Sequence, residues 1–249
     1  MKILRYEKKK NGMYQVFFDN GNNFDIHEEI ILKYEMLLKK EFKNSEIEKL
    51  LDENKIYIVY DLAIKYIAKK MRSKREIINY LQGKEIDNDT ISKVIDILYK
   101  QKYLDDEMYA KAYVNDRILL SMDGPLKIRS KLEELGIKEE YINNALVEFT
   151  EDIEKEKIKK IIDKKITTNR TKSNYVLRNK IIEYLYTLGY SRAISTSIIS
   201  EAKFENDSEI IKKEYEKIYN KLSKKYSGKE LEYRVKQKMY AKGFSGYIE

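Results

Sequence analysis

Apolar residues recur at helical spacing along most of the chain, beginning near Glu28. They follow the three- and four-residue intervals that place side chains on one face of a helix. The clearest early examples are Ile30, Ile31, Tyr34, Leu37, Leu38, Ile47, Leu50 and Leu51. The pattern predicts a mostly helical protein in which short turns join the helices.

The first 26 residues follow a different pattern. Residues 13–18 are strand-like in composition, and they lie between Asn11-Gly12 and Asn20-Gly21, two dipeptides that are typical of hairpin turns. We therefore expect a small antiparallel β element of two or three strands at the N-terminal end of the sequence.

One motif occurs four times. An apolar residue is followed four positions later by a second one, four further on by a turn position, and then directly by another apolar residue. Residues four apart share a helix face, and glycine at the turn position favours the left-handed conformation that ends a helix. The copies lie 51, 53 and 54 residues apart, at Ile77, Leu81, Glu85 and Ile86; Ile128, Leu132, Gly136 and Ile137; Ile181, Leu185, Gly189 and Tyr190; and Val235, Met239, Gly243 and Phe244.

Each complete copy is expected to contain three helices. Caps and first-turn acids mark second helices from Asp87, Lys138 and Ser191, and third helices near Asp105, Glu151 and Asp207. Such units cannot bury their apolar faces alone, so they should stack into an elongated, curved array. The expected domains are an N-terminal β-hairpin with helices at 1–60, three-helix repeats at 61–122, 123–172 and 173–227, and a partial fourth repeat or C-terminal cap at 228–249.

The only proline supports the boundary between the first two copies. In Gly124-Pro125 the glycine suits a helix cap, and the proline suits the first helical position, where its missing N–H costs nothing. A helix is therefore predicted to begin at Pro125.

The sequence offers no set of residues for catalysis. There are no cysteines and one histidine, His27, so neither a disulfide nor a thiolate or histidine metal site can be assembled. Asp105-Asp106 should cap a helix, because no carboxylate–histidine set accompanies them. Gly243-Phe244-Ser245-Gly246 lacks the preceding strand and the lysine of a phosphate-binding loop. We expect a protein that is not an enzyme and needs no metal or cofactor.

The net positive charge arises entirely in the second part of the chain. Residues 1–150 carry 27 basic and 27 acidic side chains, whereas residues 151–249 carry 23 and 15. An excess of this kind points to an anionic partner, most often a phosphate backbone. AT-rich coding, which enriches Lys, Ile, Asn and Tyr, is the competing explanation. No apolar run approaches the roughly 18 residues of a membrane span, and no signal peptide is evident, so we expect a cytoplasmic protein.

Three motifs occur in a specific order. Residues 72–81 read RSKREIINYL, residues 103–110 read YLDDEMYA and residues 124–137 read GPLKIRSKLEELGI. Their combination resembles the RecX family, the small bacterial modulators of the RecA recombinase. The N-terminal β element is similar to that of Gram-positive members, so the resemblance covers essentially the whole chain. Glu85, at a position that is glycine-like in the family, is a departure that should leave the fold unchanged.

The resemblance implies a non-enzymatic regulator in DNA repair, DNA recombination and the SOS response. Such a protein would bind along the groove of the RecA–single-stranded DNA filament and inhibit RecA ATPase activity, filament extension and strand exchange. Its partners would be the RecA filament and single-stranded DNA, reached through the filament or directly. We expect it to act as a monomer.

Basic residues of the repeats are the candidate contacts with RecA or DNA. For any one of them a solvated helix face is the competing interpretation, so only the cluster carries the hypothesis. The candidates are Arg72, Lys74, Arg75, Arg117, Lys127, Arg129, Lys131, Arg178, Lys180 and Arg234.

The 22 tyrosines and 7 phenylalanines are expected mainly between helices, and stacking on bases is the minority role. The tyrosines predicted to pack within one repeat are Tyr80, Tyr99, Tyr103, Tyr109 and Tyr113.

Two other functions fit the same features. Tandem short helices with positive charge also suit a direct DNA-binding helical protein without a RecA partner. A helical-repeat scaffold for an unrelated protein is the third alternative. A RecA pull-down separates the first function from the third, and the salt dependence of binding to bare DNA separates the second.

Overall fold

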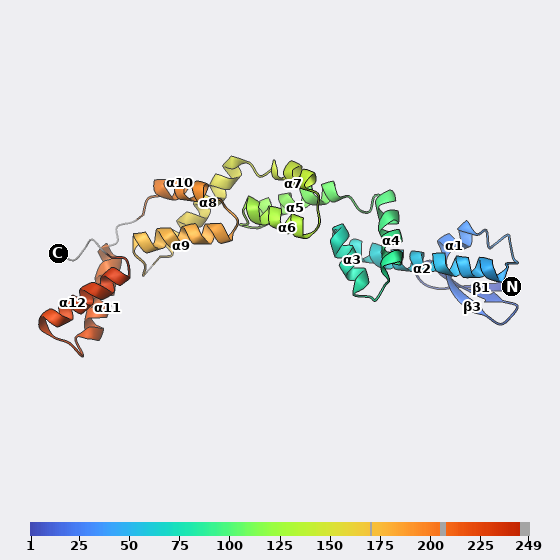
Figure 1. Cartoon of the computed structure of the whole chain (residues 1–249), viewed down its shortest axis with the longest axis horizontal. Coiled ribbons are helices and arrows are strands. Elements are labelled where there is room, and N and C mark those ends of the chain that lie inside the picture. Colours follow the sequence, from blue (N-terminus) through green and yellow to red (C-terminus); the bar gives the residue numbers. More distant parts are fainter. Residues whose placement is uncertain (170, 205–207, 245–249) are drawn as a thin grey trace. The chain divides into compact units, whose positions relative to one another are not determined.

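The computed structural model describes residues 1–169, 171–204 and 208–244, and Figure 1 shows their helices and strands. The chain divides into two compact units. The first contains residues 1–110 and 134–141, and the second contains residues 111–133 and 142–249. No helix of the described residues has both the length and the apolar character needed to cross a membrane.

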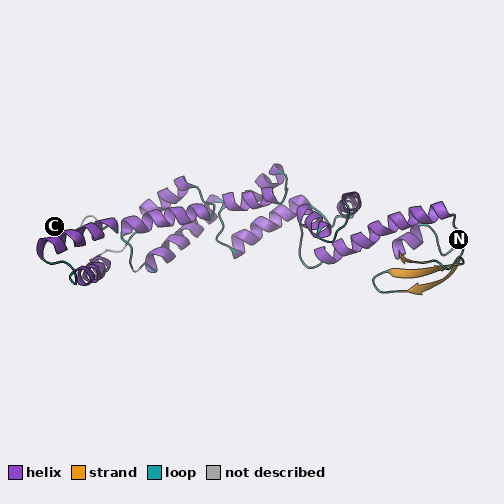
Figure 2. Ribbon diagram, turned by 60° about the horizontal axis from the view of Figure 1, so that its bottom comes forward, coloured by secondary structure: helices purple, strands orange, loops and turns teal. Residues whose placement is uncertain are grey.

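The first unit begins with a three-stranded antiparallel sheet, shown in Figure 2. Its strands are β1 (Ile3–Lys8), β2 (Met13–Phe18) and β3 (Asn23–His27), in the order β1-β2-β3. Asn11 and Gly12 both have positive φ, as the turn between β1 and β2 requires. The prediction of a small antiparallel element is confirmed, with three strands.

Two helices follow the sheet, α1 (Glu28–Lys33) and α2 (Asn44–Ile67). The first half of α2 buries Ile47 and Leu50 in the core of the sheet. Its second half buries Val59 and Ala63 in the next core along the chain. One helix thus joins the β element to the helical part of the first unit, and the boundary expected after residue 60 falls inside it.

The next helices begin close to where the caps indicate. They are α3 (Lys74–Gln82), α4 (Asn88–Lys100), α5 (Asp106–Leu120), α6 (Pro125–Glu134), α7 (Glu139–Leu146) and α8 (Glu151–Thr167). Asp105 accepts a hydrogen bond from the Met108 N–H at 2.8 Å, which confirms its role as a helix cap. Helix α6 begins at Pro125, also as predicted.

The remaining helices are α9 (Asn174–Thr187), α10 (Arg192–Glu201), α11 (Ser208–Leu222) and α12 (Gly228–Ala241). Helices α11 and α12 share a separate core that includes Ile218, Val235 and Met239. Asp207 lies outside the described residues, so only the helix that begins at Ser208 can be compared with the expected third helix.

The motif has the same structure in all four copies. The paired apolar residues are at most 1% exposed in each: Ile77 and Leu81, Ile128 and Leu132, Ile181 and Leu185, Val235 and Met239. The turn positions are left-handed, with φ of 61° at Glu85, 76° at Gly136, 89° at Gly189 and 81° at Gly243. The predicted repeat is confirmed, and Glu85 adopts the glycine conformation despite its side chain.

In the second unit, the first helices of successive copies meet end to end. The Gly124 and Leu126 N–H groups at the start of α6 donate to the carbonyls of Leu188 and Gly189 at 2.6 and 3.0 Å. At the next junction, the Ser173 hydroxyl at the start of α9 donates to the Lys242 carbonyl at 3.3 Å. The C-terminal turn of one first helix therefore packs on the N-terminal turn of the preceding one.

Candidate partner-binding surface

Arg72 is held inside the first unit rather than presented to solvent. Its guanidinium lies 3.9 Å from the centre of the Tyr66 ring, and its Nη1 donates to a Glu76 carboxylate oxygen at 3.2 Å. The side chain is 13% exposed. These contacts fix the start of α3 and leave little of the charge accessible to a partner.

Glu76 is the centre of this arrangement. Its carboxylate accepts hydrogen bonds from the Ser73 N–H at 2.9 Å and the Tyr109 hydroxyl at 3.0 Å, in addition to Arg72. Burial by itself raises the pKa of Glu76, but these hydrogen bonds outweigh it and the pKa is below its usual value. The carboxylate therefore stays ionised and ties α3 to α5.

Lys74 and Arg75 are exposed on the first turn of α3. They line a cavity of about 400 Å³ in the first unit, together with Ile78, Asn79, Gln82, Leu135 and Gly136. Neither forms an ion pair with the residues that the structure describes, although the Lys74 ammonium lies 6.0 Å from the Tyr99 ring centre. Two exposed candidate charges therefore line this cavity.

In the second unit, Asp123 forms ion pairs with two of the candidate basic residues, Lys127 and Arg117. Its carboxylate lies 2.7 Å from the Lys127 Nζ and 3.9 Å from the Arg117 Nη1. Arg129 is half-buried and donates to the Asn143 side-chain oxygen at 2.6 Å. Lys131 is exposed one turn beyond Lys127. Lys127, Arg117 and Arg129 thus already use part of their hydrogen-bonding capacity on other residues of the fold.

The later candidates also differ in exposure. Arg178 is half-buried, donates to the Ile199 carbonyl at 3.3 Å and lies 4.0 Å from the Phe204 ring centre. Arg234 is exposed, but it pairs with Glu230 at 3.0 Å. Lys180 is exposed and has no ion pair with any described residue. Lys127, Lys180 and Arg234 each directly precede the first buried residue of their motif, so this basic position recurs in three copies.

Lys157 is a polar residue that the sequence interpretation missed. It is 8% exposed, and its Nζ donates to the carbonyls of Ser121 at 2.7 Å and Arg117 at 3.4 Å. Burial lowers its pKa. It satisfies carbonyls at the end of α5, as a C-terminal cap does. Its place beside Ile158 and Ile161 on the buried face of α8 was a signal available in the sequence.

Comparison with known proteins identifies the chain's relatives. Residues 60–98 match the model of the RecX first three-helix domain, and residues 105–146 match that of the RecX second three-helix domain. Regulatory protein RecX of Oceanobacillus iheyensis is 30% identical over 248 residues, which cover 96% of this chain and 91% of the relative. The chain belongs to the RecX family. Regulatory protein RecX of Streptococcus agalactiae serotype III is 31% identical over 249 residues, covering 98% of this chain and 95% of the relative.

Solved RecX structures share the fold. A crystal structure of regulatory protein RecX matches with a TM-score of 0.70 and 26% identity, over 79% of this chain and 98% of that one. RecX from Lactobacillus salivarius matches with a TM-score of 0.54 and 29% identity, over 59% of this chain and 95% of that one. The expected family and the mostly helical fold of three-helix repeats with a small β element are thereby confirmed, and RecX is by name a family of regulatory proteins.

The tyrosines of this RecX-family chain follow the prediction only in part. Tyr80 and Tyr99 pack against the core of the first repeat and buried Tyr109 bonds to Glu76, as expected, and Tyr113 is half-buried. Tyr103 is 51% exposed, so its predicted packing position is wrong. Four tyrosines of the later repeats are more exposed still, at Tyr175, Tyr186, Tyr233 and Tyr240. Their intervals of 11 and 7 residues match a helix face, but this face is not the one that the buried motif residues occupy.

Proposed function

We propose that this protein binds along the RecA–single-stranded DNA filament and inhibits RecA ATPase activity, filament extension and strand exchange without catalysing a reaction. The observation that carries the proposal is similarity to regulatory protein RecX over nearly the full length of the chain and of its relatives. Repeated three-helix units suit a partner that itself repeats along a filament. A net charge of +8 suits DNA enclosed by that filament.

The ten candidate basic residues make different contributions to this proposal. Arg72, Arg117 and Arg178 stabilise the fold through contacts with Tyr66, Asp123 and Phe204. We assign direct contact with RecA or DNA first to Lys74, Arg75 and Lys180. Lys127, Arg129, Lys131 and Arg234 are secondary contacts, because a partner would have to compete with the groups that already hold most of them.

The decisive experiment measures RecA ATPase activity and filament assembly on single-stranded DNA with increasing amounts of the protein. The proposal predicts that both fall in a dose-dependent manner. Unchanged ATPase activity and assembly at saturating protein would refute it. A RecA pull-down with and without single-stranded DNA then identifies whether the bound species is the filament.

The contact assignment is tested with Lys74→Glu/Arg75→Glu. Charge reversal at two contacts should weaken filament binding about tenfold or more, because it replaces attraction by repulsion. Arg72 is left unchanged, since its loss would perturb α3 directly.

The matched control for this variant is Lys8→Glu/Lys10→Glu, which changes the net charge equally at two exposed positions of the β element. Binding should then stay close to that of the unmodified protein. Equal weakening by both double variants would show that net charge, rather than this cavity, sets the affinity.

A further inference from the structure

Four tyrosines that are more than half exposed lie on the first helices of the last two repeats. Tyr175 and Tyr186 on α9 are 69% and 54% exposed, and Tyr233 and Tyr240 on α12 are 62% and 72% exposed. Eleven residues span about three turns and seven about two, so each pair lies along one helix face. Tyr186 and Tyr240 occupy equivalent positions of their repeats, 54 residues apart. We call the four side chains the tyrosine strip.

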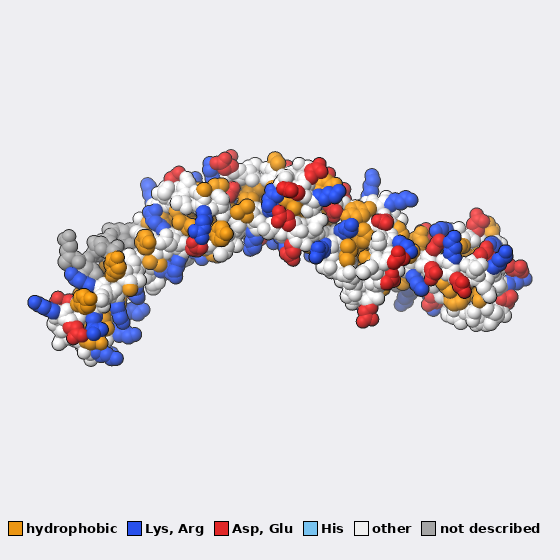
Figure 3. All heavy atoms as spheres, viewed as in Figure 1, with side chains coloured by type: hydrophobic (Ala, Val, Ile, Leu, Met, Phe, Trp, Pro, Cys, Tyr) orange, Lys and Arg blue, Asp and Glu red, His pale blue; other side chains and the backbone are white. Residues whose placement is uncertain are grey.

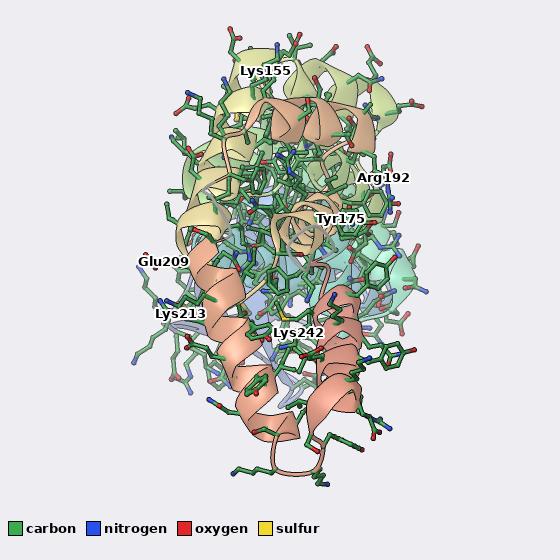
Figure 4. The ribbon with its side chains drawn as sticks, turned by 90° about the vertical axis from the view of Figure 1, so that its left-hand side faces the viewer. Lys155, Tyr175, Arg192, Glu209, Lys213 and Lys242 are labelled. Atoms are coloured by element: carbon green, nitrogen blue, oxygen red, sulfur yellow. The ribbon has the colours of Figure 1, made fainter. Side chains whose placement is uncertain are left out.

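The two helices that carry the strip meet at the junction between the end of α12 and the start of α9. A Cβ at Gly243 would lie 2.6 Å from the Ser173 hydroxyl and 3.7 Å from a Tyr175 ring carbon. The end of α12, one turn after Tyr240, therefore contacts the start of α9 beside Tyr175. Figure 4 labels Tyr175 and Lys242 on the two sides of this junction. Tyr175, on the first turn of α9, thus lies close to the turn that follows Tyr240.

The strip is not explained by packing within the fold. Tyr99, Tyr109 and Tyr190 use their hydroxyls in hydrogen bonds to Asp106, Glu76 and the Met122 carbonyl. The hydroxyls of Tyr175, Tyr186 and Tyr240 make no hydrogen bond within the described part of the chain. Rings that are more than half exposed leave apolar faces in water, and several in one line mark an interaction surface.

Positive charge surrounds the strip. Lys229 and Lys236 lie on the same face of α12 as Tyr233 and Tyr240, at intervals of three and four residues. The Arg192 guanidinium lies 5.0 Å from the Tyr186 ring centre and also pairs with Glu183. Residues 221–244 carry eight basic and two acidic side chains. Figure 3 shows Lys and Arg side chains gathered over the α11 and α12 end of the chain.

This combination favours single-stranded nucleic acid as the partner. A cationic face attracts phosphates, and exposed rings stack on bases whose own faces are free, which is the recognition mode of single-stranded nucleic acid. Bases in a duplex are stacked on each other and offer no such surface. An acidic protein surface would also satisfy the lysines and pack on exposed rings, and the RecA arm of the experiment below tests that partner.

We propose that the tyrosine strip is a direct binding site for single-stranded DNA. Unpaired bases stack on Tyr175, Tyr186, Tyr233 and Tyr240, while the phosphates pair with Lys229, Lys236 and Arg192. The site acts in the absence of RecA, so it is independent of the inhibition proposed above. Tyrosines of the third and fourth repeats thereby stack on bases, a role that the sequence predicted for only a minority of the tyrosines.

The test is anisotropy of a fluorescent oligothymidine titrated with the full-length protein, without RecA. Tyr175→Ala/Tyr240→Ala should weaken binding at least about 25-fold, since loss of each ring costs about 1–3 kcal/mol. Tyr175→Phe/Tyr240→Phe keeps the rings and should bind within about threefold of the unmodified protein. Tyr215→Ala/Tyr219→Ala, on α11, is the matched control and should do the same. Circular dichroism checks that each variant is folded.

Salt and duplex controls complete the experiment. Removing two phosphate contacts with Lys229→Gln/Lys236→Gln should reduce the log–log salt slope by about 1.4, at about 0.7 for each contact, whereas the alanine variant should leave the slope unchanged. Duplex DNA should bind more weakly than the oligothymidine. Equal affinity for duplex, no binding of bare single strands, or alanine and phenylalanine variants of equal affinity would each overturn the proposal. Alanine variants that lose only RecA inhibition would identify the strip as a protein contact and overturn it too.

Discussion

Replacing Gly189 by alanine should damage the junction between α6 and α9. Gly189 has a φ of 89°, where an L-residue costs about 1–2 kcal/mol. The added Cβ would collide with the Lys127 amide nitrogen and lie 2.5 Å from its Cβ. Overpacking of this kind costs about 1–3 kcal/mol more. We therefore expect Gly189→Ala to destabilise the second unit by about 2–5 kcal/mol.

Gly136 supplies the position-matched control for this prediction. It occupies the same turn of the preceding repeat with a φ of 76°, but a Cβ there would have no atom within 4 Å. Gly136→Ala should thus cost only the conformational part, about 1–2 kcal/mol. Because Gly136 belongs to the first unit, its cost is measured on the amides of that unit, and the excess cost of Gly189→Ala in the second unit reports the backbone contact at the junction.

The assay is native-state hydrogen exchange with peptide-level resolution, because two units need not unfold in one transition. The Leu126 N–H, which donates to the Gly189 carbonyl, should lose protection in Gly189→Ala. Amides of the first unit should be unaffected by that variant. If Gly189→Ala costs no more than Gly136→Ala, and the Leu126 amide keeps its protection, the end-to-end contact does not persist in solution and the reasoning fails.

Two further substitutions test local energetics. Glu85→Gly should stabilise the first unit by about 0.5–1 kcal/mol, because glycine adopts the left-handed φ of 61° without strain, although its greater entropy in the unfolded chain offsets part of this gain. Glu85→Ala keeps the strain and should give no gain. Denaturant unfolding of the three proteins measures the difference. Burial, and secondarily repulsion from Glu151, raises the pKa of the Glu154 carboxyl. Because the pKa of Glu154 is higher in the folded protein than in the unfolded chain, the folded protein is most stable in acid, and stability falls as the pH rises through the folded-state pKa. Glu154→Gln removes this loss, so it should raise the Tm at neutral pH and give no gain below about pH 4.3. A gain that is constant with pH would contradict this.

The repeat was predictable because sterics fix both of its parts. Ile181 and Leu185 must face inward together, and the turn at Gly189 needs a left-handed residue, so sequence spacing alone reports them. Glu85 keeps the same conformation without glycine, which shows that the packing of the copy, rather than one residue, determines the turn.

The partner surface was less predictable, because the identity of a basic residue does not report what it touches. Arg72 and Arg75 look alike in the sequence, yet one packs on Tyr66 and Glu76 while the other lines an open cavity. The tyrosine strip has helical spacing like the core, and only its offset from the buried residues distinguishes it. The contact of Gly189 with Lys127 joins residues 62 positions apart, and no local pattern encodes it.

The end-to-end meeting of α6 and α9 also decides how α6 can interact with anions. The N-terminal amides of a helix are ready donors for phosphate oxygens, and many nucleotide sites exploit them together with the helix dipole. Here the Gly124 and Leu126 amides are already committed to the carbonyls of Leu188 and Gly189. Neither of these two amides is available to a phosphate held near α6, so side chains must replace them, and single lysine or arginine substitutions should tune the affinity without any change of backbone.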